Sequence, residues 1–280
     1  MAKIRIVTDS TCDLPKELLE QYHIGLVPLK VIFGNEVYRD GIDMSPKEFY
    51  QRLPLAEKTP TTSQPSPGEF VCLYEHLARE EYSVISIHIS GEISGTVQSA
   101  ELGGKMVPDL DLHVVDSKTV SLGLGLIVLA AAKAAMEGQS KSEILDLVNA
   151  LVSRCRLYFV LDTLEYLHKG GRIGRAGALL GSLLNIKPIL TFKDGVVTPV
   201  DKLRGRNRAI ERILALVKEQ AGNRKIMCGV LHGNDFSGVM KLHERVVNEY
   251  DCAEILISEI SPVIGTYAGP GAVGLAYFTL

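Results

Sequence analysis

The 280-residue sequence contains no tryptophan, and aromatic residues make up only 6% of it. It therefore lacks the stacking surfaces on which proteins hold single-stranded nucleic acids. Positive charge is not in excess either, because 30 lysines and arginines stand against 33 acidic residues and the net charge is −3. Charges of both signs are spread along the chain, so the sequence has no cluster of basic residues that would bind nucleic acid or an anionic membrane. We expect no nucleic-acid partner.

Cysteine is scarce and scattered through the chain. The five cysteines are Cys12, Cys72, Cys155, Cys228 and Cys252. An odd number without any C-x-x-C pair argues against a disulfide framework and against a zinc site. The longest apolar run, residues 122–132, is far shorter than the ~20 residues that cross a bilayer, and the first residues lack a signal-peptide pattern. We expect a cytoplasmic protein without an integral membrane span.

The motifs of common enzyme classes are also missing. The sequence has no G-x-x-x-x-G-K-[ST] loop and no H-E-x-x-H pair, and residues 123–128 lack the third glycine of a dinucleotide fingerprint. Residues 91–95 read G-x-x-S-G, one position out of step with the nucleophile elbow G-x-S-x-G. We therefore expect no catalytic residue, no metal and no cofactor. A hydrolase or transferase that uses Ser94, with His88 or His232 as its base, stays open as an alternative.

Strand-like runs alternate with helix-like segments along the chain, which predicts an α/β fold with a parallel sheet. The length lies near the point where a single core splits, so we expect two domains, residues 1–155 and 156–280. Three capping boxes of the form S-x-x-E mark helix starts, at Ser45, Ser66 and Ser140. The sequence Asp194-Gly195 between β-branched runs predicts a hairpin.

Several local predictions depend on weaker signals. Asp13 and Pro15 suggest the start of a helix that ends near Tyr22. Residues 25–33 read as one strand, residues 59–67 as a loop shaped by three prolines, and residues 265–271 as a loop before a last strand. Gly174, Gly177 and Gly181 recur at helical spacing, which predicts a helix with a narrow apolar face; close helix-to-sheet packing is the alternative interpretation.

Small polar residues follow three of the predicted strands, at residues 8–10, 90–96 and 116–117. Right-handed crossovers bring the carboxyl ends of parallel strands to one edge of the sheet, where ligands bind in such folds. Aspartate and serine at strand ends also serve simply as caps and turn formers, and for any single position the two interpretations are equally good. The three together favour a site.

The stretch from Ser86 to Ala100 is the most informative part of the sequence. An apolar run ends in a cluster of Ser, Gly and Thr and then opens into a helix-compatible segment. Such an arrangement delivers amide groups and hydroxyls to an anion at a helix N-terminus. We therefore predict an anion-holding site centred on Ser94. The hydroxyls of residues 59–67 suit a carboxylate ligand, whose apolar tail needs a dry groove.

Six segments of this chain resemble the motif set of the DegV family, bacterial fatty-acid-binding proteins of which some carry the lipid for a fatty acid kinase. They are TDS (8–10), PTTSQPSP (60–67), ISGTVQSA (93–100), VDS (115–117), LEYLHKGGRI (164–173) and IGTYAGPG (264–271). The segments follow one another in the family's order and span nearly the whole chain. Together they are far more specific than any one of them.

The resemblance implies a fold of two α/β domains with the ligand between them. One is a three-layer α/β/α domain with a parallel sheet, and the other a smaller two-layer α/β domain with a mixed sheet. The implied ligand is a long-chain fatty acid whose carboxylate is bound by the hydroxyls of Thr62 and Ser94 and by the Gly95 amide. The full set of implied ligand-binding residues is Thr61, Thr62, Ser94, Gly95, Thr96, Arg172, Thr266, Tyr267 and Gly269.

In the family's kinase system a separate ATP-binding subunit phosphorylates the bound fatty acid, which agrees with the missing nucleotide motif. Tyr267 stands where the family commonly has histidine, and a phenol donates a hydrogen bond but carries no positive charge near neutral pH. Binding should tolerate this difference better than phosphoryl transfer. Arg204 and Arg206 are either partner-facing or part of a solvated helix start. A lipid-sensing regulatory protein is a further alternative.

Overall fold

The computed structural model describes residues 3–181 and 186–280, which form α-helices packed against three β-sheets. The first sheet has the strand order β2-β1-β6-β7 and is entirely parallel. Its strands are β1 (Lys3–Asp9), β2 (Gly25–Val27), β6 (Tyr82–His88) and β7 (Leu112–Asp116). The predicted parallel sheet is confirmed, and β1, β6 and β7 end side by side at one edge of it.

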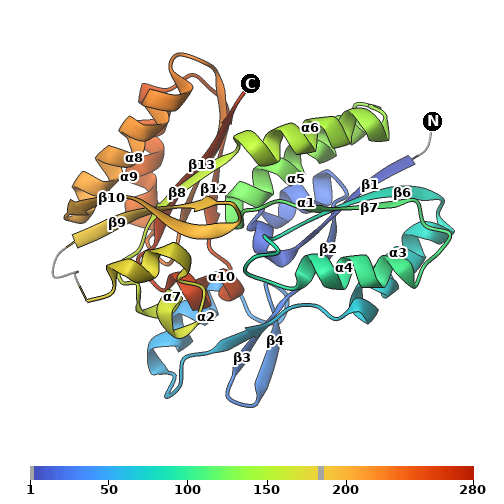
Figure 1. Cartoon of the computed structure of the whole chain (residues 1–280), viewed down its shortest axis with the longest axis horizontal. Helices are drawn as coiled ribbons and strands as arrows, with labels where there is room; N and C mark the ends of the chain where they lie inside the picture. Colours follow the sequence, from blue (N-terminus) through green and yellow to red (C-terminus); the bar gives the residue numbers. More distant parts are fainter. Residues whose placement is uncertain (1–2, 182–185) are drawn as a thin grey trace.

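The second sheet is mixed and has the strand order β10-β9-β8-β13-β11-β12. Its strands are β8 (Arg156–Val160), β9 (Ile186–Lys193), β10 (Val196–Arg204), β11 (Ile226–His232), β12 (Cys252–Glu259) and β13 (Val273–Thr279). The predicted hairpin joins β9 to β10, and Asp194 and Gly195 both adopt the positive φ of a type I′ turn. Figure 1 shows the two sheets next to one another.

Between the two sheets lies α5 (Ser121–Met136), followed by α6 (Lys141–Arg154). Most of α5 is fully buried, because it packs on β1 and β6 on one side and on β8, β11 and β13 on the other. A helix that is apolar on all sides belongs in such a position. Its leucines join the largest apolar core, which includes side chains from both sheets.

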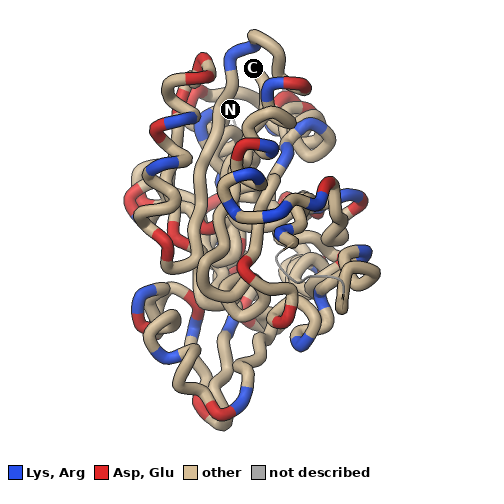
Figure 2. Tube along the Cα trace, turned by 90° about the vertical axis from the view of Figure 1, so that its left-hand side faces the viewer, with Lys and Arg blue, Asp and Glu red and all other residues tan. Residues whose placement is uncertain are grey.

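The outer faces of the sheets are covered by amphipathic helices. On the first sheet these are α3 (Pro67–Arg79) and α4 (Thr96–Lys105), and on the second α8 (Arg206–Ala221) and α9 (Phe236–Glu249). The helix α1 (Lys16–Gln21) is short. The capping boxes at Ser45, Ser66 and Ser140 are all present. Lysines and arginines alternate with acidic residues over the surface seen in Figure 2, so this view shows no face of one sign.

A third, three-stranded sheet lies at one end of the molecule and was not predicted. It consists of β3 (Lys30–Phe33), β4 (Glu36–Arg39) and β5 (Thr61–Ser63) in the antiparallel order β4-β3-β5. The prediction of one strand over residues 25–33 is therefore wrong, because the chain leaves the first sheet at Val27 and enters the third at Lys30. Residues 59–67 include the short strand β5, whose Thr62 pairs with Val31.

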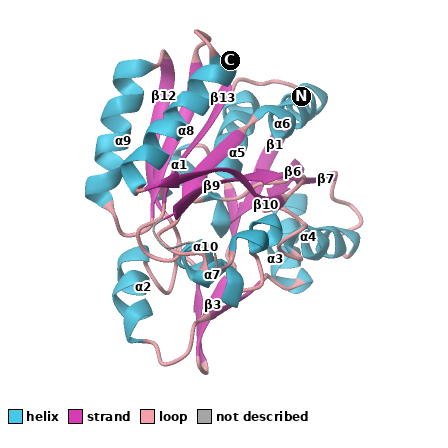
Figure 3. Ribbon diagram, turned by 60° about the vertical axis from the view of Figure 1, so that its left-hand side comes forward, coloured by secondary structure: helices cyan, strands magenta, loops and turns pink. Residues whose placement is uncertain are grey.

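Near this sheet lie α2 (Pro46–Arg52), α7 (Glu165–Lys169) and α10 (Pro262–Ala268) (Figure 3). The loop predicted over residues 265–271 is thus largely the helix α10, which begins at the N-cap Ser261 with Pro262 in its first position. Short 3₁₀ turns cover 10–12, 53–55 and 174–179. Among the described residues, no helix is long and apolar enough to cross a membrane.

Two further local predictions are wrong. Gly174 and Gly181 have φ of +52° and +82°, so the glycines do not share one helical face; part of this predicted face, Leu183 and Leu184, lies outside the described residues. Asp13 does not cap α1, which has Pro15 as its N-cap. Instead the buried Asp13 side chain turns inward. The domain division at residue 155 stays a prediction.

Candidate functional site

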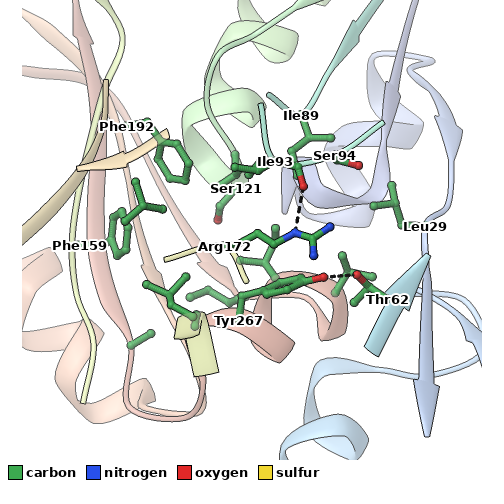
Figure 4. Close-up of a pocket in the computed structure, with 18 of the residues that line it drawn as sticks. Leu29, Thr62, Ile89, Ile93, Ser94, Ser121, Phe159, Arg172, Phe192 and Tyr267 are labelled. Carbon is green, nitrogen blue, oxygen red and sulfur yellow. Dashed lines mark hydrogen bonds between the residues drawn. The ribbon is translucent and has the colours of Figure 1, made fainter. Parts of the chain in front are cut away.

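A partly open cavity of about 320 Å³ lies between the two large sheets and is lined mostly by apolar side chains. Figure 4 shows Phe159 and Phe192 on the opposite side of it from Thr62 and Ser94. The apolar part of the lining is Leu29, Ile89, Ile93, Val120, Leu157, Phe159, Leu161, Leu167, Phe192, Val197, Leu231, Ile260, Val263, Ile264, Ala268 and Ala272. Its volume falls in the range of small-molecule sites, and its lining suits an apolar ligand.

Polar side chains gather at one end of this cavity. Of the predicted ligand-binding residues, four line it: Thr62, Ser94, Arg172 and Tyr267. Thr62 Oγ1 and the Tyr267 hydroxyl lie 2.5 Å apart and form a hydrogen bond (Figure 4). This contact joins β5 to α10, two elements about 200 residues apart in the sequence.

Arg172 crosses the polar end of the cavity. Its guanidinium lies 5.3 Å from the centre of the Tyr267 ring, within the range of a cation–π contact. Its Nε donates to the Ile93 carbonyl at 3.2 Å and Nη1 to the Gly170 carbonyl at 2.9 Å. Within residues 3–181 and 186–280 no carboxylate forms an ion pair with Arg172. Its charge is therefore available to an anion that enters from the cavity.

Ser94 stands in the turn that leads from β6 into α4, as predicted for a helix start. Its hydroxyl lies 2.8 Å from the Thr96 hydroxyl and accepts a weak hydrogen bond from the Thr96 amide. The Gly95 amide is already occupied, since it donates to Gln64 Oε1 at 3.0 Å. The prediction that this amide holds the ligand therefore does not fit the geometry, whereas the Ser94 hydroxyl lines the cavity.

The other predicted ligand-binding residues do not line the cavity. Thr61 is exposed on the opposite face of β5, and Thr96 is buried behind Ser94. Thr266 turns back within α10, where its hydroxyl donates to the Pro262 carbonyl at 2.9 Å. Gly269 has a φ of +69°, and a Cβ there would collide with the Tyr166 ring.

The cavity also has three polar lining residues that were not among the predicted ligand-binding residues: Ser63 and Gln64, which lie within the predicted segment 59–67, and Ser121. Gln64 links the 59–67 segment to α4, because its amide also donates to Ser99 Oγ at 3.1 Å. The only sequence signal for Gln64 as a lining residue is its position between threonines and prolines. A neighbouring depression shares Ile93, Ser94 and Arg172 with the cavity and brings solvent to its polar end.

The strand-end aspartates serve the fold. Asp9 Oδ2 accepts from the Ile89 amide and lies 3.0 Å from His88 Nδ1, and Asp116 accepts from the amides of Gly91 and Lys118. For these two strand ends the alternative interpretation as turn formers describes the contacts. The three strand ends do meet, but of the three only the segment around Ser94 contributes a polar side chain to the cavity.

Neither histidine considered as a base is a partner of Ser94. His88 is fully buried and its two ring nitrogens contact Asp9 and Ser86. His232 accepts from the Asp235 amide through Nδ1, and burial lowers its pKa. The described part of the chain therefore gives Ser94 no nucleophile–base pair. No group of three or more potential metal ligands occurs among residues 3–181 and 186–280.

The two predicted partner-facing arginines differ from one another. Arg206 is tied to the protein, since its guanidinium pairs with Asp162 at 3.5 Å and with Asp235 at 2.5 Å. Arg204, at the end of β10, is exposed and has no ion pair in the described ranges. Of the two, only Arg204 has a free charge to offer.

Comparisons with known proteins agree with the motif resemblance. The family model described as "Uncharacterised protein, DegV family" matches residues 3–280. A DegV domain-containing protein of Halalkalibacterium halodurans is 39% identical, over 99% of both chains. The solved structure of a fatty-acid-binding DegV family protein from Thermus thermophilus has a TM-score of 0.95 and 40% identity, covering 99% of this chain and all of the other. DegV of Bacillus subtilis, described as a fatty acid binding protein, has a TM-score of 0.93 and 38% identity over both full chains.

Proposed function

The chain belongs to the DegV family, and on this basis we propose that it binds a long-chain fatty acid in the cavity between its two large sheets. The observation that carries the proposal is the mostly apolar lining of the cavity, with Thr62 and Ser94 on the side opposite Phe159 and Phe192. Each methylene buried in the apolar part contributes ~0.8 kcal/mol, so the acyl chain supplies most of the affinity. The polar end orients the carboxylate.

The carboxylate is proposed to lie among Thr62, Ser94, Arg172 and Tyr267. Three hydroxyls offer hydrogen bonds there, and Arg172 adds the positive charge that makes such bonds stronger. The contact between Thr62 and Tyr267 supports this placement, because it brings two hydroxyls from distant segments together; one donates to the other, and the second keeps a free O–H for the carboxylate. Gly170 supports it as well, since a side chain at this position would collide with the Tyr267 ring.

A finer proposal is that the protein presents the bound carboxylate to a separate ATP-binding kinase subunit. The solvent-open depression beside Ser94 and Arg172 would let a second protein reach the carboxylate, and Arg204 offers an exposed charge for docking. Incubation of the loaded protein with that subunit and ATP, followed by hydroxylamine, should give the acyl hydroxamate. A fatty-acid-loaded homologue that reacts under the same conditions is the positive control. If the homologue reacts and the lipid on this chain stays unmodified, the chain binds fatty acid but does not present it to the kinase subunit.

Mass spectrometry of a solvent extract from the purified protein tests fatty-acid binding directly. We expect a single class of long-chain fatty acid, near one molecule per protein chain. Protein that carries no lipid and also fails to take up added oleate or palmitate would contradict the proposed function.

Substitution of the hydroxyls tests where the carboxylate lies. Ser94→Ala and Thr62→Val should each weaken fatty-acid binding by ~1–3 kcal/mol, the cost of leaving a buried polar group without its partner. Titration calorimetry with one fatty acid measures the change. The matched control is Thr61→Val, the neighbouring exposed residue, which should leave the affinity unaltered. If Ser94→Ala and Thr62→Val bind the fatty acid as tightly as the wild type does, Ser94 and Thr62 do not hold the carboxylate.

A further inference from the structure

Two buried carboxyl groups from the first part of the chain meet the start of α10, the helix that carries Tyr267. Asp13 Oδ1 accepts a hydrogen bond from the Ser261 amide at 3.1 Å, and Asp40 Oδ1 accepts one from the Val263 amide, also at 3.1 Å. The first amides of a helix have no partner within it, so these carboxyl groups complete the helix from outside. They fix the position of α10 relative to the first half of the chain.

Asp13 also reaches the wall of the cavity. Its Oδ2 accepts a hydrogen bond from the Ser121 hydroxyl, and Ser121 lines the cavity. Its backbone carbonyl accepts from the hydroxyl of Ser258 on β12. A single residue thus connects the cavity wall, the second sheet and α10, and a movement of α10 would break its contact with the Ser261 amide.

Three buried polar atoms around this cluster have no hydrogen-bond partner among the residues that the structure describes: Asp40 Oδ2, the Tyr50 hydroxyl and Ser261 Oγ. The ionisable groups that face the pair are Asp9 and Cys12 beside it, Tyr50 from α2 and Glu259 from β12. In the described part of the chain no lysine or arginine pairs with either carboxyl group. Two buried carboxylates without a cation repel one another, and a proton on one of them removes that repulsion.

Burial raises the pKa of Asp13 to about 7, with the charge of Asp40 as a smaller cause, and burial raises the pKa of Asp40 to about 6, with the charge of Asp9 as a smaller cause. The packed arrangement therefore favours the protonated forms more than a water-exposed arrangement does. Because both pKa values are raised, protonation stabilises the packed arrangement fully at pH values below the ordinary pKa range of a carboxyl group. This stabilisation is lost as the pH rises through about 6 and 7.

We propose that Asp13 and Asp40 are positioning residues that hold α10, and with it Tyr267, against the cavity, and that they hold it most firmly while the pair retains a proton. The inference rests on the proposed function, because Tyr267 matters there as a ligand donor. If α10 moves away, water reaches both carboxyl groups and they ionise more readily. Ionisation therefore favours the open arrangement, and a bound fatty acid should leave faster at pH 8 than at pH 6.

Infrared titration of the ligand-free protein tests the carboxyl pair without any lipid. We expect the C=O stretch of a protonated carboxyl group to persist above pH 6 in the wild type and to weaken or disappear in Asp13→Asn, which removes the carboxyl group with the higher pKa. An asparagine keeps the oxygen that accepts from Ser261 but neither ionises nor carries charge. Absence of the band from the wild type would overturn the proposal, and this result does not depend on how any variant folds.

The dissociation rate of a fluorescent fatty acid tests the link to the cavity. In the wild type we expect it to rise about tenfold between pH 6 and pH 8, because a carboxyl group of pKa about 7 in the closed arrangement loses its proton within this range, whereas in the open arrangement it is ionised throughout. In the double variant Asp13→Asn/Asp40→Asn the rise should shrink to that of the ligand alone. The matched control, Asp43→Asn, should keep the wild-type profile, because Asp43 is an exposed partner of Arg39.

The outcomes separate the two proposals. A wild type that binds no fatty acid refutes the proposed function, while the infrared band still reports on the pair. A wild type that binds, with the same pH profile in all variants, refutes the positioning role and leaves fatty-acid binding intact.

Discussion

Ala268→Phe is expected to lower the affinity for a long-chain fatty acid by more than about a hundredfold while the protein stays folded. Ala268 lines the cavity at the end of α10, so a phenyl ring there would occupy space proposed for the acyl chain. Displacing roughly four methylenes removes ~3 kcal/mol of binding free energy. The ring enters an existing space, so we expect no comparable loss of folding stability.

Two measurements check this prediction, fatty-acid titration and thermal unfolding of the lipid-free protein. Ala253→Phe is the control, because Ala253 is exposed on β12 and does not line the cavity. The control should bind like the wild type. Undiminished binding in Ala268→Phe would mean that the acyl chain lies elsewhere.

Asp9→Ala should destabilise the folded protein by about 3–5 kcal/mol, the cost of breaking a buried charged network. The Asp9 carboxylate is fully buried and accepts from the Thr11 amide at 3.1 Å and the Ile89 amide at 3.0 Å, besides its contact with His88. Alanine would leave these groups buried without partners. Urea unfolding followed by circular dichroism measures the loss.

Asp116→Ala is the matched control for that variant. Asp116 also stands at the end of a parallel strand and accepts from two amides, but it is partly exposed and pairs with Lys118 at 2.7 Å. Water can replace the lost contacts there, so the cost should be about 1 kcal/mol. If both variants lose the same free energy of unfolding, the burial of the Asp9 network does not add to its contribution to stability.

Much of the fold could be predicted because local signals and tertiary structure agree. The S-x-x-E boxes mark three helix starts, and the Asp-Gly turn marks the hairpin. Regular strand–helix alternation identified the parallel sheet, and the ends of β1, β6 and β7 lie along one edge as expected. In each case a short-range pattern is sufficient to specify the geometry.

The errors have identifiable physical causes. An apolar run cannot show that β2 and β3 belong to different sheets, although Pro28 between them offered a break. Glycines at helical spacing predict a helix face, yet two of the three adopt positive φ. α10 was missed even though Ser261-Pro262 repeats the start of α2 at Ser45-Pro46, because the glycines that follow suggested a loop.

For the candidate site, the residue types could be predicted from the sequence, but not which side chains lie next to one another in the folded protein. Ser94 was singled out from its place at a helix start. The juxtaposition of Thr62 and Tyr267, and of Arg172 with the Tyr267 ring, depends on the packing of α10 against β5 and the loop after α7. No local pattern encodes such a contact. The roles of Asp13 and Asp40 were missed for the same reason, since both partners lie more than 200 residues away.

The position of β13 in the second sheet has a kinetic consequence. It pairs with β8 on one side and β11 on the other, so it joins β8–β10 to β11–β12. β8 and β13 are separated by more than a hundred residues, and such long-range pairing forms late.

Pulsed hydrogen exchange during refolding should find amides of β1 and β6 protected before those of β13. Simultaneous protection would contradict this order. Until β13 docks, the wall that includes Ala272 is incomplete, so capacity to take up lipid should emerge only in the last folding step.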